Sequence, residues 1–148
     1  MNPFRERLQR DKLDVIVASR YRSGATISGV PPIRRLMSRG AGVLFKLLHP
    51  ISGIRDYSCG YRLYTRELLE RAVATWGSDL IEQRGFASMV ELLLKRGKMG
   101  AKAGEIPLQL RYDQKRGESK MPVAENSTRL LKLMWQWRQS GLEPKKKT

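Results

Sequence analysis

The sequence predicts an α/β fold built on a small sheet, and three observations support that class. A short β-branched apolar run at residues 13–18 is typical of a buried parallel strand. Segments with apolar residues at three- and four-residue steps follow it and predict amphipathic helices, so strands alternate with helices. Only two or three segments resemble strands, whereas a buried parallel strand needs a neighbour on each side. The sheet is therefore expected to be incomplete.

The N-terminal part of the chain is expected to place its first strand between two helices. Residues 4–10 carry mixed charge and predict a short helix, and residues 19–32 predict a loop punctuated by glycine and proline. Residues 33–48 predict an amphipathic helix that ends before Pro50. Residues 51–64 predict a loop or short strand with the densest cluster of polar residues.

The following segments continue the alternation of helices and strands. Thr65 is a suitable N-cap for a helix over residues 66–76. A further helix is predicted over residues 86–96 with Gly97 as its C-cap, and a strand over residues 104–112. The last predicted segments are a polar loop at 114–122, an amphipathic helix at 127–139 and a basic tail at 145–147.

Composition indicates one folded unit, or part of one, with an anionic partner. Apolar residues make up 41% of the 148 residues, which argues against wholesale disorder. The formal net charge of +15 favours phosphates, nucleic acid or an acidic membrane surface as partners. No apolar run approaches the roughly 18 residues that span a bilayer, and residues 1–11 lack the apolar segment of a secretory signal, so we expect a soluble or peripheral protein.

Cysteine and histidine usage adds two constraints. Cys59 is the only cysteine, which excludes an intrachain disulfide and fits a reducing compartment. Because the chain also has a single histidine, its composition argues against a zinc site.

The first group of candidate site residues surrounds the helix predicted after the first strand. Between Asp14 and Asp56 the chain has no acidic residue and several basic ones. Arg20 directly follows the predicted strand, where open α/β sheets bind ligands. Arg34 and Ser38 share a helix face in the first turns, where amides and the helix dipole favour an anion. Together they suit a phosphate group, and the alternative is a solvated basic face.

Two further groups lie in polar loops. In residues 55–64, RDYSCGYRLY, Asp56 adjoins an arginine and Arg62 lies between aromatic residues. A carboxylate beside arginines either forms a structural ion pair or orients an acceptor or catalytic group. Residues 111–121, RYDQKRGESKM, combine Gly and Ser with several bases. That segment suits either a lid over a phosphate or an ordinary charged surface loop.

Two predicted helices also allow two interpretations each. Glu91 lies in an otherwise apolar helix and is either exposed or buried against a partner, expected to be an arginine. The last helix suits either an anionic membrane interface or plain core packing. Its apolar face consists of Leu130, Leu133, Met134 and Trp137, widened by Leu131 and Trp135 and flanked by Arg129, Lys132 and Arg138.

Taken together, these segments resemble the polyprenyl-phosphate and dolichol-phosphate hexosyltransferases of glycosyltransferase family 2, of the dolichol-phosphate mannose synthase type. The resemblance covers about residues 12–135, and the five matching blocks come in the family's order with family-like gaps. The blocks are DVIVASRY at 14–21, RRLMSRGA at 34–41, RDYSCGYRLYTRELLE at 55–70, GFASMVELLLKRG at 85–97 and EIPLQLRYDQKRGESKM at 105–121.

The resemblance implies a partial GT-A fold and inverting transfer of a hexose from a nucleotide sugar to a lipid phosphate. Because that phosphate is already anionic, the main tasks of the protein would be positioning and charge stabilisation. The implied acceptor-phosphate residues are Arg20, Arg34, Ser38, Arg116, Ser119 and Lys120, and the implied catalytic residues are Asp56 and Arg62. Gln114 and Lys115 stand where the family often has an arginine, and Ser88 and Met89 replace a common Phe-Gln pair.

The N-terminal nucleotide-binding strands of the family and its metal-binding DxD motif have no counterpart in the sequence. Mg²⁺ or Mn²⁺ is expected for the full-length family, where it offsets the diphosphate charge of the leaving group. We expect residues 1–124 to form the acceptor-side C-terminal half of a GT-A domain, 125–141 an amphipathic interfacial helix and 142–148 a basic tail. Such a chain is expected to be inactive alone and peripheral on the cytoplasmic face of a membrane.

Two other functions remain as hypotheses. One is a basic nucleic-acid-binding module in which Trp135 and Trp137 stack on bases, although no zinc finger, RNP-like motif or clear helix-turn-helix is present. The other is a non-catalytic membrane-surface protein that uses only the last helix. The family resemblance instead predicts a lipid phosphate acceptor and no nucleic acid, and it requires Arg20, Arg34 and Ser38 to share one cavity.

Overall fold

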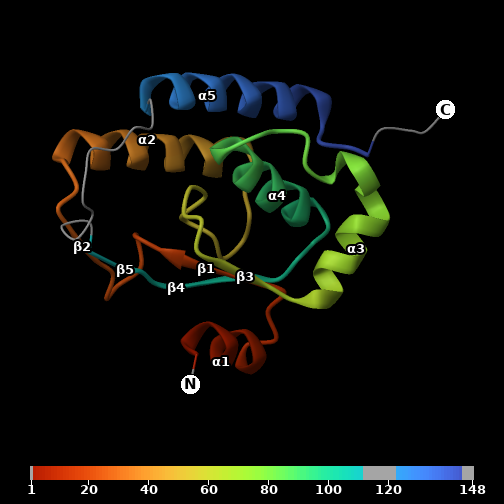
Figure 1. Cartoon of the computed structure of the whole chain (residues 1–148), viewed down its shortest axis with the longest axis horizontal. Helices are drawn as coiled ribbons and strands as arrows, with labels where there is room; N and C mark the ends of the chain where they lie inside the picture. Colours follow the sequence, from red (N-terminus) through yellow and green to blue (C-terminus); the bar gives the residue numbers. More distant parts are fainter. Residues whose placement is uncertain (1, 112–122, 145–148) are drawn as a thin grey trace.

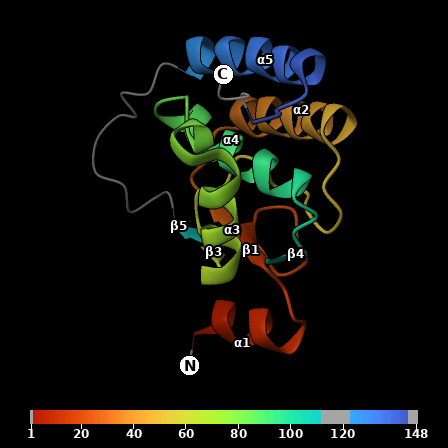
Figure 2. The ribbon, with the colours of Figure 1, turned by 90° about the vertical axis from the view of Figure 1, so that its right-hand side faces the viewer.

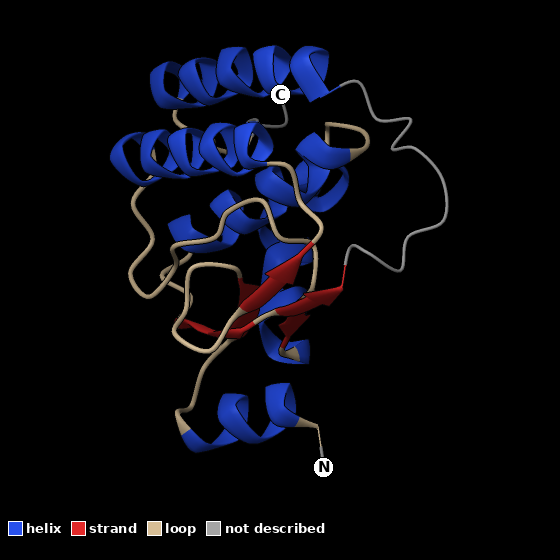
Figure 3. Cartoon of the chain, turned by 90° about the vertical axis from the view of Figure 1, so that its left-hand side faces the viewer, coloured by secondary structure: helices blue, strands red, loops and turns tan. Residues whose placement is uncertain are grey.

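The computed structural model describes residues 2–111 and 123–144 and shows a small mixed sheet between helical layers (Figure 1). Helix α1 (Pro3–Arg10) lies against one face of the sheet. Over the other face lie α2 (Pro32–Leu48), α4 (Phe86–Lys98) and α5 (Val123–Ser140). Helices α2 and α5 run side by side in the outermost layer, as Figures 1 and 3 both show.

The central sheet confirms the predicted buried strand. Strand β1 (Val15–Ser19) is buried along its whole length, as expected for a β-branched apolar run. It pairs antiparallel with β3 (Arg62–Tyr64) and parallel with β4 (Ala103–Pro107), in the order β3-β1-β4. Strand β1 thus has a neighbour on each side, and within the described residues β3 and β4 form the edges of the sheet. The predicted α/β class is confirmed.

Two strand predictions need correction. The loop predicted after β1 contains the short strand β2 (Thr26–Ser28), and the strand predicted over residues 104–112 is divided into β4 and β5 (Gln109–Arg111). The division falls at Leu108, whose amide donates to the carbonyl oxygen of Ser19 at 3.0 Å. Because β1 ends there, the chain beyond Leu108 pairs with β2 instead and forms a separate two-stranded parallel sheet.

The helix predictions are confirmed to within a few residues, with one corrected end. Thr65 caps α3 (Arg66–Trp76), and its hydroxyl accepts a hydrogen bond from a first-turn amide. Helix α4 continues through Gly97 to a C-cap at Met99, so the predicted C-cap at Gly97 is wrong. A Cβ at position 97 would lie 2.8 Å from Cγ1 of Ile51. Close packing against Ile51, rather than helix termination, explains this glycine.

Glu91 is buried, and its partner is a lysine rather than the expected arginine. Its Oε1 lies 2.7 Å from Nζ of Lys95, one turn further along α4. Its Oε2 accepts hydrogen bonds from the amides of Glu82 and Gln83 at 3.0 and 2.9 Å. Lys95 also donates to a carbonyl oxygen of the 3₁₀ helix η1 (Gly77–Leu80). The pair therefore joins α4 to the segment that follows α3.

Helix α5 divides its apolar residues between the core and the surface. Leu130, Met134 and Trp137 are buried in the core, whereas Leu131 is 42% and Trp135 is 58% exposed. Figure 2 shows α5 above α2, at the opposite end of the molecule from α1. Core packing therefore accounts for one side of α5 only. Within the described ranges, no helix combines the length and the hydropathy that crossing a bilayer requires.

Candidate functional site

One cavity brings together Arg20, Arg34, Ser38 and Asp56, four of the predicted site residues. Its volume is about 680 Å³, and its lining comes mainly from α2, α5, the residues after β1 and the loop before β3. Arg20, Arg34 and Ser38 therefore line one cavity, as the phosphate hypothesis requires.

Much of the remaining lining is apolar. Leu44 and Phe45 of α2 face the cavity together with Leu130 and Met134 of α5, and Phe86 adds a side chain from the start of α4. A cavity that joins basic side chains to apolar walls suits a ligand with an anionic group and a hydrocarbon portion.

Asp56 holds Arg20 in a two-point ion pair. Nε and Nη2 of Arg20 donate to Oδ2 and Oδ1 of Asp56, both at 2.8 Å. The same carboxylate accepts hydrogen bonds from the amides of Ser58 and Cys59 at 3.2 and 3.1 Å. Nη2 of Arg20 also donates to the hydroxyl of Ser58. The Asp56 side chain is fully buried, whereas that of Arg20 is 23% exposed.

The electrostatics keep this pair charged. Burial acts to raise the pKa of Asp56, but the hydrogen bonds and charge of Arg20 outweigh burial and hold that pKa below its ordinary value. Burial acts to lower the pKa of Arg20, and the Asp56 carboxylate raises it instead. A carboxylate engaged by fixed donors on both oxygens is well placed to orient Arg20. A direct catalytic role for Asp56 stays a prediction.

The residues at this site do not fit a divalent cation. Mg²⁺ and Mn²⁺ need several oxygen ligands, and both oxygens of Asp56 already accept hydrogen bonds. In the described ranges, no three His, Cys, Asp or Glu side chains gather closely enough to hold a metal ion. The metal expected for the family therefore finds no ligand set among these residues.

Tyr21 belongs to the site, although it was not predicted. Its hydroxyl lies 3.1 Å from the hydroxyl of Ser38, and its ring centroid lies 5.6 Å from the guanidinium carbon of Arg20. Tyr21 lines the same cavity and connects the two predicted residues. Its position directly after Arg20, within the DVIVASRY block, was the signal that could have indicated it.

The start of α2 offers fewer free amide donors for an anion than the sequence analysis predicts for the first turns of this helix. Pro31 and Pro32 have no N–H group. The amides of Arg34 and Arg35 donate to the carbonyl oxygen of Pro31 at 3.1 and 3.2 Å. Anion binding in this part of the cavity therefore depends mainly on side chains.

The remaining predicted site residues lie elsewhere. Arg62 does not line the cavity, and its guanidinium donates to the carbonyl oxygens of Tyr57 and Met89 at 2.6 and 2.5 Å. It thus connects the loop before β3 to α4, and its catalytic role stays a prediction. Arg116, Ser119 and Lys120 lie outside the described residues.

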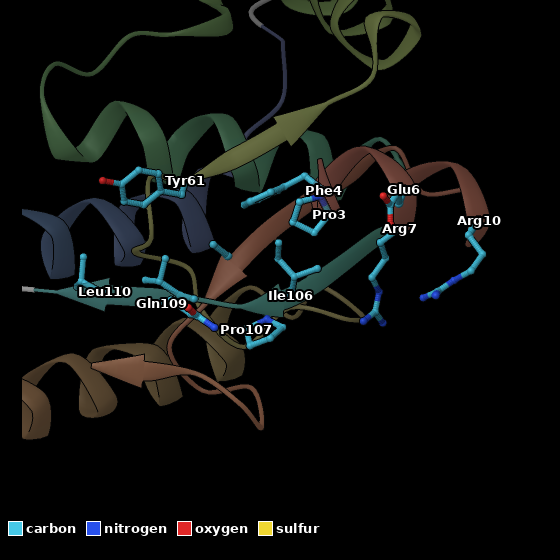
Figure 4. A pocket seen from close by; sticks show the side chains of 12 residues that line it. Pro3, Phe4, Glu6, Arg7, Arg10, Tyr61, Ile106, Pro107, Gln109 and Leu110 are labelled. Atoms are coloured by element: carbon cyan, nitrogen blue, oxygen red, sulfur yellow. The ribbon is translucent and has the colours of Figure 1, made fainter. Parts of the chain in front are cut away.

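A second hollow lies on the opposite face of the sheet, beside α1 (Figure 4). Its volume is about 780 Å³, and its lining includes Phe4, Tyr61 and Ile106. Two arginines also line it, and both donate to the neighbouring Asp11. The cavity lined by α2 and α5 is the better candidate because Arg34, Arg35, Arg39 and Ser38 line it together with Arg20.

Comparison with known proteins agrees with the resemblance carried by the sequence blocks. No protein-family model matches the chain. The chain is 29% identical over 108 residues to polyprenol monophosphomannose synthase of Mycolicibacterium smegmatis, and the alignment covers 73% of the chain and 38% of that relative. The chain thus spans well under half the length of the curated relative. The similarity supports a relationship to polyprenyl-phosphate mannosyltransferases of glycosyltransferase family 2.

Proposed function

We propose that this chain forms the acceptor-binding part of a family 2, GT-A-type glycosyltransferase that transfers a hexose to a polyprenyl phosphate. The observation that carries the proposal is the single cavity in which Arg20, Arg34 and Ser38 meet apolar walls from α2 and α5. Two further observations support it. The named relative acts, by its name, on a polyprenol, and the small mixed sheet is compatible with part of a glycosyltransferase-like fold.

The proposed chemistry needs little activation of the acceptor. A phosphate oxygen of the lipid would attack the anomeric carbon of a nucleotide sugar, and the bond from that carbon to the diphosphate would break, with inversion. Because the phosphate is already anionic, the arginines would position it and offset its charge rather than remove a proton. The nucleotide sugar and Mg²⁺ or Mn²⁺ follow from the family resemblance alone.

The lipid would approach from a membrane against which α2 and α5 lie. Along α2, Ile33, Leu36, Val43 and Leu47 are 62–72% exposed, and α5 adds the exposed Trp135. Helix α2 contains several bases and no acidic residue. Exposed apolar side chains beside bases are typical of helices at an anionic bilayer surface. The membrane-associated location, on the cytoplasmic face, is part of this proposal.

Binding of a short-chain polyprenyl phosphate to the chain, measured by calorimetry in mild detergent, tests the proposal. Replacing Arg34 or Ser38 with Ala should weaken binding roughly tenfold, because each change removes a donor to the phosphate. Arg71→Ala is the matched control, since it removes one positive charge from an exposed position on α3.

Equal affinity for the unphosphorylated polyprenol would contradict the proposal. So would unchanged affinity in the Arg34→Ala, Ser38→Ala double variant. Salt-sensitive binding of single-stranded RNA that this double variant retains would favour the nucleic-acid hypothesis instead.

A further inference from the structure

Glu105 is a buried carboxylate that the proposed chemistry does not use. It lies in β4, opposite Val17 of β1, and its side chain has no exposed surface. Its Oε1 accepts hydrogen bonds from the amides of Arg55 and Asp56 at 2.6 and 2.7 Å. Burying a carboxylate lowers the stability of the fold unless the carboxylate makes compensating hydrogen bonds. Here it accepts hydrogen bonds from two successive amides of one loop.

The same loop carries the carboxylate that holds Arg20. The amide of Asp56 donates to Glu105, and α2 packs against the same loop at Gly42, where a Cβ would lie 3.7 Å from the carbonyl oxygen of Arg55. The Asp56 side chain then binds Arg20 at two points. Contacts therefore run without a break from strand β4 to a guanidinium that lines the cavity.

We propose that Glu105 is a positioning residue for the acceptor phosphate, because it fixes the Asp56 main chain and, through the Asp56 carboxylate, the direction of the Arg20 guanidinium. The inference rests on the proposed function, since it assigns to Glu105 an effect on the same phosphate. Glu105 itself does not touch the ligand, and it is absent from the cavity lining.

The reach of the side chain, rather than its charge, performs this task. Only Oε1 makes hydrogen bonds to the loop. Oε2 lies 3.6 Å from Nε of Arg22, and among the described residues neither of these two atoms has a hydrogen-bond partner. A glutamine at position 105 would keep an acceptor oxygen where Oε1 lies. An aspartate would keep the charge but withdraw the oxygen by one methylene.

The test compares Glu105→Gln, Glu105→Asp and Glu105→Met by two measurements. The first is the hydrogen exchange of the Arg20 Nε–H group, observed by NMR without ligand. The second is the affinity for a short-chain polyprenyl phosphate. Glu105→Gln should preserve both, whereas Glu105→Asp and Glu105→Met should speed the exchange and weaken the affinity, each roughly tenfold.

A merely structural glutamate would affect stability but leave the Arg20 Nε–H exchange and the affinity of the folded variants unchanged. Rescue of these two measurements by Gln but not by Asp is therefore the decisive readout. If Glu105→Met fails to fold, the comparison of Gln with Asp still decides. The inference would be overturned if Glu105→Asp kept the wild-type exchange and affinity while Glu105→Gln lost both. The charge of the side chain, rather than its reach, would then determine the position of Arg20. If the wild-type chain binds no polyprenyl phosphate, the proposed function fails, and the Arg20 Nε–H exchange still reports whether Glu105 fixes that guanidinium.

Discussion

Oδ2 of Asp56 accepts hydrogen bonds from both the backbone amide and the side-chain Nε of Arg20, at 3.0 and 2.8 Å. One carboxylate thus fixes the main chain and the side chain of the same arginine, although the two residues are 36 positions apart. The first residue after β1 is thereby tied to the loop that precedes β3. An arginine held in this way keeps one orientation at the cavity wall, which reduces the entropy that phosphate binding would cost.

Asp56→Asn is expected to destabilise the chain and weaken polyprenyl phosphate binding together. The amide cannot accept at both positions, so Arg20 loses half of its two-point contact and, with it, its fixed orientation at the cavity wall. Breaking a buried ion pair costs about 3 kcal/mol of unfolding free energy, which urea denaturation would measure. Asp11→Asn is the matched control, because Asp11 pairs with two arginines at the surface and should matter far less. Equal losses in the two variants would contradict the role given to Asp56.

Tyr21→Phe is expected to affect ligand affinity more than stability. The change removes only the hydroxyl that lies 3.1 Å from the hydroxyl of Ser38. Without it, Ser38 has one fixed partner fewer, and the dissociation constant for polyprenyl phosphate should rise about three- to tenfold. Tyr61→Phe provides the control, because Tyr61 is 63% exposed and does not line this cavity. Calorimetry on both variants would show whether the loss is confined to Tyr21.

Local sequence signals predicted most of the secondary structure. The β-branched run located β1, and Thr65 located the start of α3 because a cap depends on residues close in the chain. The division at Leu108 could not be predicted in the same way. It depends on where β1 ends and on the pairing of β5 with β2, and both are tertiary relationships.

The site shows the same limit. Asp56 stands next to Arg55 in the sequence, yet its ion-pair partner is Arg20, because the fold brings the end of β1 to that loop. Glu91 was expected to meet an arginine, and the lysine one helical turn away satisfies it instead. Helical spacing could have indicated that partner. Glu105 begins the matching block at 105–121, but its role in the loop could not be predicted, because its two amide partners lie 49 and 50 positions away.

Membrane attachment is expected to depend on the exposed side of α5. Replacing both Leu131 and Trp135 with Ser should lower binding to vesicles that contain anionic lipid by roughly tenfold or more. In the unchanged chain both exposed apolar side chains would move from water into the bilayer surface, and the serines would not gain that free energy. Val73→Ser is the control, since Val73 is 57% exposed but lies on α3. Vesicle sedimentation of the three proteins would measure the difference. Retained binding in the α5 variant would assign the membrane contact to another surface.

The contact between α2 and α5 is expected to weaken in mild acid through His49, the only histidine of the chain. His49 is the C-cap of α2, and its Nε2 lies 3.1 Å from the carbonyl oxygen of Met134 in α5. Burial lowers the pKa of His49 most strongly, the hydrogen bond to Met134 opposes that shift, and the charges of Arg138 and Lys98 lower the pKa further.

Because the folded chain disfavours the protonated imidazole, the stabilising effect of neutral His49 is complete above its ordinary pKa of 6.5 and is lost as pH falls toward the lowered folded value. The unfolding free energy from urea denaturation should therefore be smaller at about pH 5 than at about pH 7.5, and His49→Gln should reduce that difference. NMR titration of the single imidazole gives an independent measurement. A folded-state pKa above 6.5 would reverse the sign of the expected effect and exclude this explanation.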